Sequence, residues 1–184
     1  MPYLIAAVVL IGLACAANLM LTFGVIRRLK AAADLGPASG PGRGMPPLLP
    51  VGGRLPDFRT RTVGGVRLDN AALAGARTLI GFFSTQCEPC REHAPDFLRY
   101  AAAEKIDPER VVAVVQGTVD QTSEFIGSYL RGGADALVVA EPDGGPVAKS
   151  LGAVAFPQFY LVDGDGVLET VELSINLLPT TAGA

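Results

Sequence analysis

The chain opens with a long run of apolar residues. Positions 3–26 are almost wholly apolar, and Asn18 and Thr22 are the main polar interruptions. A stretch of this length can cross a bilayer as a helix. A cleaved signal peptide is the alternative, but the start of the chain carries no charged side chain and the apolar run is longer than a usual signal core. We therefore expect residues 1–30 to form an N-terminal transmembrane helix with a basic flank.

The pattern changes after this run. Residues 31–50 are rich in Ala, Gly and Pro, which break regular structure and suit a semi-flexible tether. Beyond them, short apolar runs alternate with polar turns and no internal repeat is visible. Residues 51–184 are enough for one domain with its own core. The expected organisation is thus an anchor at 1–30, a linker at 31–50 and a domain at 51–184.

Within the domain, the apolar positions predict alternating strands and helices. The near-continuous apolar runs at 78–83 and 111–116 are typical of central strands that are covered on both faces. The other expected elements are a hairpin at 59–68, helices at 88–105, 120–130 and 146–151, a strand at 136–140, and a hairpin formed by 158–162 and 167–173. Asp120 is the expected N-cap of the second of these helices. A βαβ unit followed by a β-hairpin predicts an α/β fold with a mixed central sheet and helices on both faces.

The net charge and the positions of the cysteines limit the classes of function that the chain can have. The net charge is −3 and the pI is about 5.1, so the composition does not indicate a nucleic-acid partner, which would require a basic face. Of the three cysteines, Cys15 lies in the apolar run, while Cys87 and Cys90 form a C-x-x-C pair between a predicted strand and a predicted helix. This spacing indicates a redox pair. There is no second C-x-x-C pair to complete a zinc site, and neither a metal nor a cofactor is expected.

The position of Cys87 favours its thiolate. Unpaired N–H groups and the macrodipole at the start of a helix stabilise negative charge. The residues therefore suggest a site of thiol–disulfide exchange.

Other segments join this pair in a larger set: L-P-D-F at 55–58, F-F-S-T-Q-C-E-P-C-R at 82–91, Pro95, and F-P-Q-F-Y-L-V-D at 156–163. Together they resemble the thioredoxin superfamily, and within it the membrane-anchored TlpA/ResA-type redoxins. The resemblance implies a thioredoxin-like fold, a nucleophilic Cys87, and Phe156-Pro157 as a cis-proline loop that faces it. Cys90 would then resolve the mixed disulfide. Because little chain follows residue 173, we expect the closing helix of the full fold to be absent or vestigial.

Three positions depart from the pattern of this group. His93 stands where members often carry a glutamate, six positions after the first cysteine. Gly81 stands where thioredoxins carry an aspartate, and Gln86 replaces a common aromatic residue. An imidazole can exchange a proton near neutral pH, so His93 is a candidate proton carrier. The alternative is a partly exposed helix residue without a role.

Glu88 lies between the two cysteines. Its carboxylate could disfavour the neighbouring thiolate or relay a proton. It could equally be a solvated acid that suits the N-terminus of a helix. The sequence leaves both possibilities open.

The predicted function is that of a membrane-tethered thiol–disulfide oxidoreductase that reduces protein disulfides through Cys87 and Cys90. The implied partners are protein thiols and disulfides, an upstream electron-donor thiol protein, and membrane lipid around the N-terminal helix. Two alternatives remain. One is a thiol peroxidase, although the P-x-x-x-T-x-x-C pattern of such enzymes is not met. The other is a metal-delivery protein, most naturally for copper, with a third ligand such as His93.

The sequence gives conflicting indications of location. A disulfide-handling domain on a membrane tether is more often useful on the oxidising side, so we expect it outside the cytoplasm. Arg27, Arg28 and Lys30 follow the apolar run, and the positive-inside tendency would keep this flank in the cytoplasm.

Overall fold

The computed structural model describes residues 49–130 and 136–180, together with the isolated positions Gly12 and Met20. Residues Met45–Ala184 form a compact unit of their own. The expected anchor at 1–30 and nearly all of the linker lie outside the described residues. Among the residues that are described, no helix is both long and apolar enough to span a membrane.

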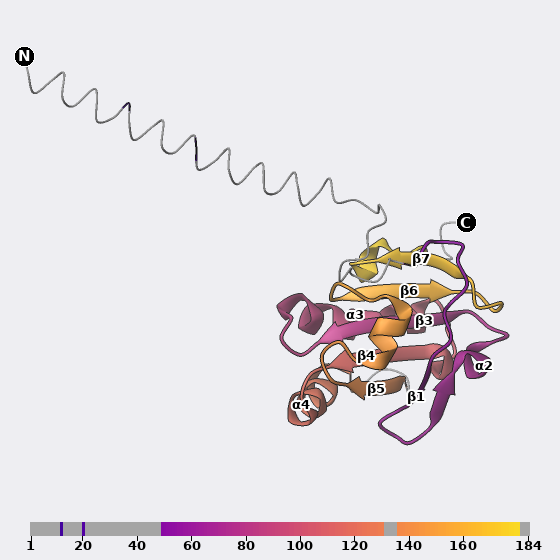
Figure 1. Ribbon diagram of the computed structural model, residues 1–184. Helices are drawn as coiled ribbons and strands as arrows, with labels where there is room; N and C mark the ends of the chain where they lie inside the picture. The colour runs from indigo at the N-terminus through magenta and orange to yellow at the C-terminus, as the bar shows by residue number, and fades with distance from the viewer. Residues whose placement is uncertain (1–11, 13–19, 21–48, 131–135, 181–184) are drawn as a thin grey trace, which may run out of the picture. The chain divides into compact units, whose positions relative to one another are not determined.

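A five-stranded sheet forms the centre of the unit (Figure 1), with the strand order β5-β4-β3-β6-β7. Its strands are β3 (Thr78–Ser84), β4 (Val111–Gln116), β5 (Leu137–Glu141), β6 (Gln158–Val162) and β7 (Leu168–Glu172). β4 runs parallel to both β3 and β5, while β6 is antiparallel to β3 and to β7. The sheet is therefore mixed, as the sequence predicts.

The two most apolar runs lie in the middle of this sheet. All six residues of β4 are buried, and so are the first six of β3. Successive side chains of a strand point to opposite faces. Leu79 and Phe83 accordingly belong to one hydrophobic cluster, whereas Ile80 and Phe82 belong to another on the opposite face. Both faces need a cover, which explains why apolar residues run continuously rather than alternate in these strands.

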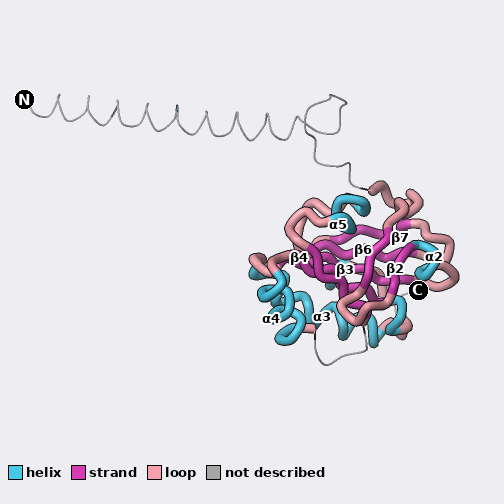
Figure 2. The backbone as a smooth tube through the Cα atoms, turned by 60° about the horizontal axis from the view of Figure 1, so that its bottom comes forward, coloured by secondary structure: helices cyan, strands magenta, loops and turns pink. Residues whose placement is uncertain are grey.

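Helices provide this cover on both sides (Figure 2). α3 (Glu88–Ala103) and α4 (Val119–Tyr129) bury residues in the cluster that contains Phe83, and α2 (Asn70–Leu73) and α5 (Pro146–Leu151) bury residues in the cluster that contains Phe82. α3 continues through Pro95. A short 3₁₀ helix, η1 (Pro108–Arg110), leads into β4. The predicted α/β architecture with helices on both faces is confirmed.

The start of α4 differs from the expectation. Its N-cap is Thr118, not Asp120. The Thr118 hydroxyl accepts a hydrogen bond from the Gln121 N–H, and the Gln121 side chain accepts one from the Thr118 N–H. This reciprocal capping box satisfies two N–H groups at once, which Asp120 in the first turn cannot do.

The predicted hairpin before the sheet is present as β1 (Arg59–Arg61) and β2 (Arg67–Asp69), an antiparallel pair. At the other end, β7 is followed by η2, a single 3₁₀ turn at Ile175–Leu177. Within the part of the chain that is described, up to residue 180, no longer helix follows, which agrees with the vestigial closing helix that was expected.

The pairing of β3 with β6 positions the site. The two strands are antiparallel, and Phe82 near the end of β3 pairs with Gln158 at the start of β6. The loop that follows β3 and the loop that precedes β6 therefore meet at the same edge of the sheet. The first loop carries Cys87 into α3, and the second carries Phe156 and Pro157.

Candidate active site

Cys87 occupies the N-cap position of α3 with an extended backbone, and its own side chain makes no capping hydrogen bond. Its N–H donates to the Ser84 carbonyl over 3.2 Å, which closes the turn after β3. Glu88 and Pro89 follow as the first helical residues. Proline is tolerated here because the N–H that it lacks would have no partner within the helix. The half-buried sulfur thus lies at a helix end that favours negative charge.

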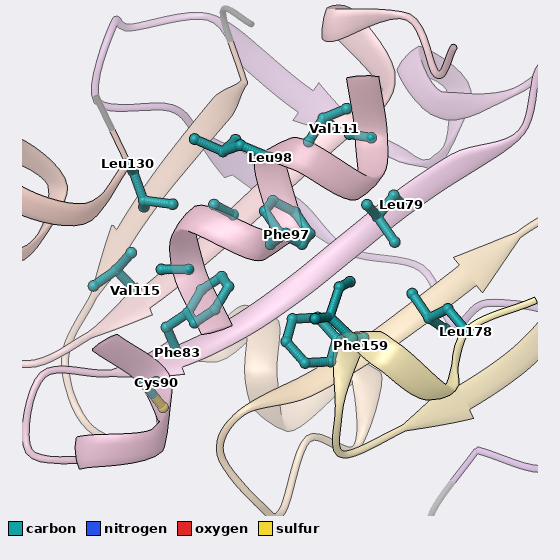
Figure 3. Packing of buried hydrophobic residues seen from close by; sticks show 14 of the residues in the cluster. Leu79, Phe83, Cys90, Phe97, Leu98, Val111, Val115, Leu130, Phe159 and Leu178 are labelled. Atoms are coloured by element: carbon teal, nitrogen blue, oxygen red, sulfur yellow. The ribbon is translucent and has the colours of Figure 1, made fainter. Parts of the chain in front are cut away.

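Cys90 lies one turn further into α3 and is fully buried. Figure 3 shows it at one end of the hydrophobic cluster, close to Phe83. Burial raises the pKa of the Cys90 thiol well above its ordinary value, and the hydrogen bond with Cys87 raises it further. The Ser84 N–H donates to the Cys90 sulfur over 3.4 Å and acts in the opposite direction. Both cysteines are free thiols in this structure.

The loop before β6 faces Cys87. The peptide bond between Phe156 and Pro157 is cis, as the resemblance implies, and Pro157 is buried. The Cys87 thiol donates to the Phe156 carbonyl oxygen over 3.2 Å. The structure therefore brings together Cys87, Cys90 and the Phe156-Pro157 pair.

The hydrogen-bond partner of Glu88 lies outside this group. Its carboxylate is exposed and accepts a hydrogen bond from Arg91 over 2.9 Å. Arg91 also donates to the Thr85 carbonyl over 3.4 Å, so it links the first turn of α3 to the loop after β3. The spacing of three residues between Glu88 and Arg91 is the signal from which this ion pair could have been expected.

His93 lies on α3 next to the core. Its ring is partly buried and stands edge-to-face against Phe159 of β6, with 6.0 Å between the ring centroids. Its Nδ1 atom is buried and has no hydrogen-bond partner among the described residues. In the same part of the chain, no hydrogen bond joins His93 to either cysteine of the pair.

The position of Gly81 explains why this site has no buried acid there. A Cβ atom at Gly81 would lie 2.7 Å from the Phe97 ring and 2.8 Å from the Phe83 ring. Real Cβ atoms essentially never approach other heavy atoms so closely, and both rings are fully buried. Two aromatic rings thus fill the space that a side chain would need.

One cluster near the site escaped the sequence reasoning. Gln158 and Tyr160 of β6 are fully buried. Gln158 accepts hydrogen bonds from the backbone of the loop that carries Phe156, and Tyr160 donates one to the Leu151 carbonyl at the end of α5. The only sequence signal is a glutamine at the start of an otherwise apolar strand. Among the described residues, no three or more His, Cys, Asp or Glu side chains lie together in a group that could hold a metal ion.

The chain is similar to known redox proteins. The thioredoxin-like protein YneN of Bacillus subtilis is 26% identical over 126 residues, which cover 66% of this chain and 71% of that protein. The thiol-disulfide oxidoreductase ResA of Bacillus thuringiensis is 23% identical over 116 residues. These cover 63% of this chain and 65% of ResA, slightly less than two thirds of its length.

Solved structures show the same fold. The thioredoxin domain of a thiol-disulfide oxidoreductase from Bacteroides vulgatus superposes with a TM-score of 0.58 at 21% identity, covering 70% of this chain and 91% of that one. The thioredoxin-like fold is therefore shown. The profile of the redoxin family matches residues 50–181, which include every element of the sheet and both cysteines of the pair. The chain belongs to the redoxin family.

Proposed function

We propose that this protein is a membrane-tethered thiol–disulfide oxidoreductase that reduces protein disulfides. One observation carries the proposal: a half-buried thiol at the N-terminus of α3, that of Cys87, faces the loop before β6, while Cys90 lies buried behind it. This arrangement separates an accessible attacking sulfur from a protected second sulfur. Two relatives point the same way, the thioredoxin-like protein YneN and the thiol-disulfide oxidoreductase ResA.

The first step is an attack by the Cys87 thiolate on one sulfur of a substrate disulfide. A new disulfide forms between Cys87 and that sulfur, and the substrate S–S bond breaks. The second substrate sulfur leaves as a thiolate and takes up a proton. The attacking sulfur lies at the N-terminus of α3, where unpaired helix N–H groups stabilise negative charge.

The second step uses Cys90. Its thiol loses a proton and attacks the Cys87 sulfur, so that the internal Cys87–Cys90 disulfide forms and the substrate leaves with two thiols. Two electrons pass from the two cysteines to the substrate. A dithiol protein upstream must then reduce the internal disulfide and become oxidised itself. The raised pKa of Cys90 keeps this sulfur protonated until the mixed disulfide has formed.

Three further residues have proposed roles. Pro157 shapes the loop whose backbone faces Cys87 and the incoming substrate. His93 takes up or returns a proton during exchange, supported by its buried Nδ1 atom that lacks a partner in the described chain. We propose that the Glu88 carboxylate adds negative charge near Cys87. Its ion pair with Arg91 partly neutralises this charge.

The location is also a proposal. The apolar positions 3–26 are long enough to anchor the chain, and the Ala-, Gly- and Pro-rich residues 31–50 would tether the redoxin domain to this anchor. We place the domain on the extracytoplasmic side because thiol exchange with disulfides is most useful there. The basic flank at 27–30 is the argument for the opposite orientation.

Trapping of partners tests the proposal. In a Cys90→Ser variant of the full chain, Cys87 should hold partner proteins as mixed disulfides that appear on non-reducing gels and disappear on reduction. The matched control is a Cys87→Ser, Cys90→Ser double variant, which should trap nothing. If the single variant traps no more than the double variant in cells, exchange is not the main function. The compartment from which trapped partners come decides the orientation.

A further inference from the structure

The loop before β6 is held by side chains from β6 itself. Two of its N–H groups, those of Val154 and Ala155, donate to the Gln158 side-chain oxygen over 3.1 and 3.4 Å. Gln158 is fully buried. Since a buried N–H without a partner is costly, this single amide oxygen satisfies two successive donors of the loop.

A second side chain continues the connection. The Gln158 nitrogen donates to the Tyr160 hydroxyl over 3.2 Å, and this hydroxyl donates to the Leu151 carbonyl at the end of α5 over 2.9 Å. Burial raises the pKa of Tyr160 to about 12, so the hydroxyl keeps the proton that it donates. Gln158 and Tyr160 thereby tie both the end of α5 and the following loop to a strand in the interior of the sheet.

The loop fixed in this way leads directly to the reactive thiol. Ala155 is followed by Phe156, whose carbonyl oxygen accepts the hydrogen bond from Cys87. The strand is also rigidly placed, because Gln158 pairs with Phe82 of β3 and the Tyr160 ring packs edge-to-face on Phe82 at 5.1 Å. A displacement of the residues before Phe156 would therefore move the carbonyl that contacts Cys87.

From these contacts we infer that Gln158 is a positioning residue of the exchange site. It does not touch the reacting sulfur. It holds the Phe156 carbonyl next to Cys87, so that this carbonyl can accept the hydrogen bond of the thiol. In the same way it fixes the position of the loop backbone that would contact a protein substrate. The inference deepens the proposed function and rests on it, but part of its test does not require exchange activity.

The test compares two buried glutamines in the full-length chain. Gln158→Met removes the amide that holds the loop while it retains a side chain of similar length. Gln116→Met is the matched control, because Gln116 is also buried and its amide binds the Gly144 N–H and Glu141, away from Phe156. Thermal unfolding of both variants checks that they remain folded at the assay temperature.

Two readouts are expected to move in opposite directions. With the carbonyl no longer fixed as an acceptor, Gln158→Met should raise the iodoacetamide alkylation rate of Cys87 at pH 7 about fivefold, the ratio expected for one hydrogen bond. Cys90 should stay unmodified. The same variant should lower the rate of insulin disulfide reduction about tenfold, because a small misplacement weakens exchange with a protein substrate. Gln116→Met should change neither rate.

Each outcome decides a different question. If Gln158→Met and Gln116→Met show equal Cys87 alkylation and equal insulin reduction, Gln158 is not a positioning residue. If alkylation rises at both cysteines, the variant has opened the domain as a whole and the inference is also overturned. If the wild-type chain reduces no insulin and traps no partner, the proposed function fails, while Cys87 alkylation still tests the position of the loop.

Discussion

The Cys87 thiol donates a hydrogen bond to the carbonyl oxygen of Phe156 over 3.2 Å, across 69 positions of the sequence. This contact joins the start of α3 to the loop before β6. The Phe156 carbonyl thus lies against one side of Cys87. On another side, Cys87 packs against the buried hydrophobic cluster that contains Cys90. The two thiols therefore differ in exposure although they are one helical turn apart.

This difference predicts the order in which the cysteines react. Cys87 is half-buried, whereas Cys90 is fully buried with a raised pKa, and only a thiolate reacts readily. Iodoacetamide at pH 7 should therefore modify Cys87 first, with at least about a tenfold difference in rate, as peptide mass spectrometry would measure. In guanidinium chloride, the two should react at similar rates. Equal rates in the folded domain would contradict the site described above.

His93 allows a test of proton transfer. If its imidazole carries a proton during exchange, His93→Gln should slow insulin reduction by about a hundredfold, because the variant lacks a group that can take up and return a proton. Glu92→Gln is the control, since Glu92 is the exposed neighbour on α3 and should leave the rate unchanged. An unchanged rate in His93→Gln would assign His93 to packing against Phe159 alone.

Gly81 should tolerate no side chain. Because the rings of Phe97 and Phe83 occupy the space, Gly81→Ala should lower the free energy of unfolding by about 1–3 kcal/mol, and Gly81→Asp by more, since it also buries a carboxyl group. Urea unfolding measures both values. Gly64→Ala is the matched control, because its nearest neighbour would be an ordinary contact at 3.7 Å. A stable Gly81→Asp domain would show that the two rings move aside easily.

Tyr160 predicts a loss of stability at high pH. Burial raises its pKa from 10.0 to about 12, so the folded state holds this proton more tightly than the unfolded state does. The resulting stabilisation is fully present below pH 10 and is lost as the pH rises through 12, and it amounts to about 2–3 kcal/mol. At pH 9, Tyr160→Phe should be less stable than the wild type because its hydrogen bonds to Gln158 and Leu151 are lost.

The comparison of the wild type with Tyr160→Phe isolates the contribution of Tyr160 to the pH dependence of stability. Cys90 and Tyr100 also have raised pKa values and also lose stabilisation at high pH, but they are common to both chains. The stability difference between wild type and Tyr160→Phe should therefore shrink between pH 10 and 12 in urea unfolding under reducing conditions. A difference that stays constant over this range would mean that Tyr160 titrates alike in the folded and unfolded chains.

Much of the fold could be predicted because it depends on local patterns. The bounds of β4, α5 and β6 agree with the strand predicted at 111–116, the helix predicted at 146–151 and the strand predicted at 158–162. The β1–β2 hairpin follows from Gly64 and Gly65. The start of α4 could not be predicted as well, because Thr118 and Asp120 are both good capping residues and only the backbone geometry selects between them.

The sequence by itself determined the redox pair, the helix start that carries it, and the strands on either side, since each depends on residues that are neighbours in the chain. The resemblance implied that Phe156-Pro157 faces Cys87. Only the tertiary structure decided that the Cys87 thiol bonds to the Phe156 carbonyl, that two rings fill the space beside Gly81, and that Gln158 holds the loop before β6. The contact between Phe156 and Cys87 requires β3 and β6 to lie next to each other in one register, because these strands carry the two loops to the same edge of the sheet. The sheet that contains both strands is buried between two layers of helices. A long-range contact of this kind leaves no periodic signal in the chain, because its two partners are brought together by packing rather than by their spacing.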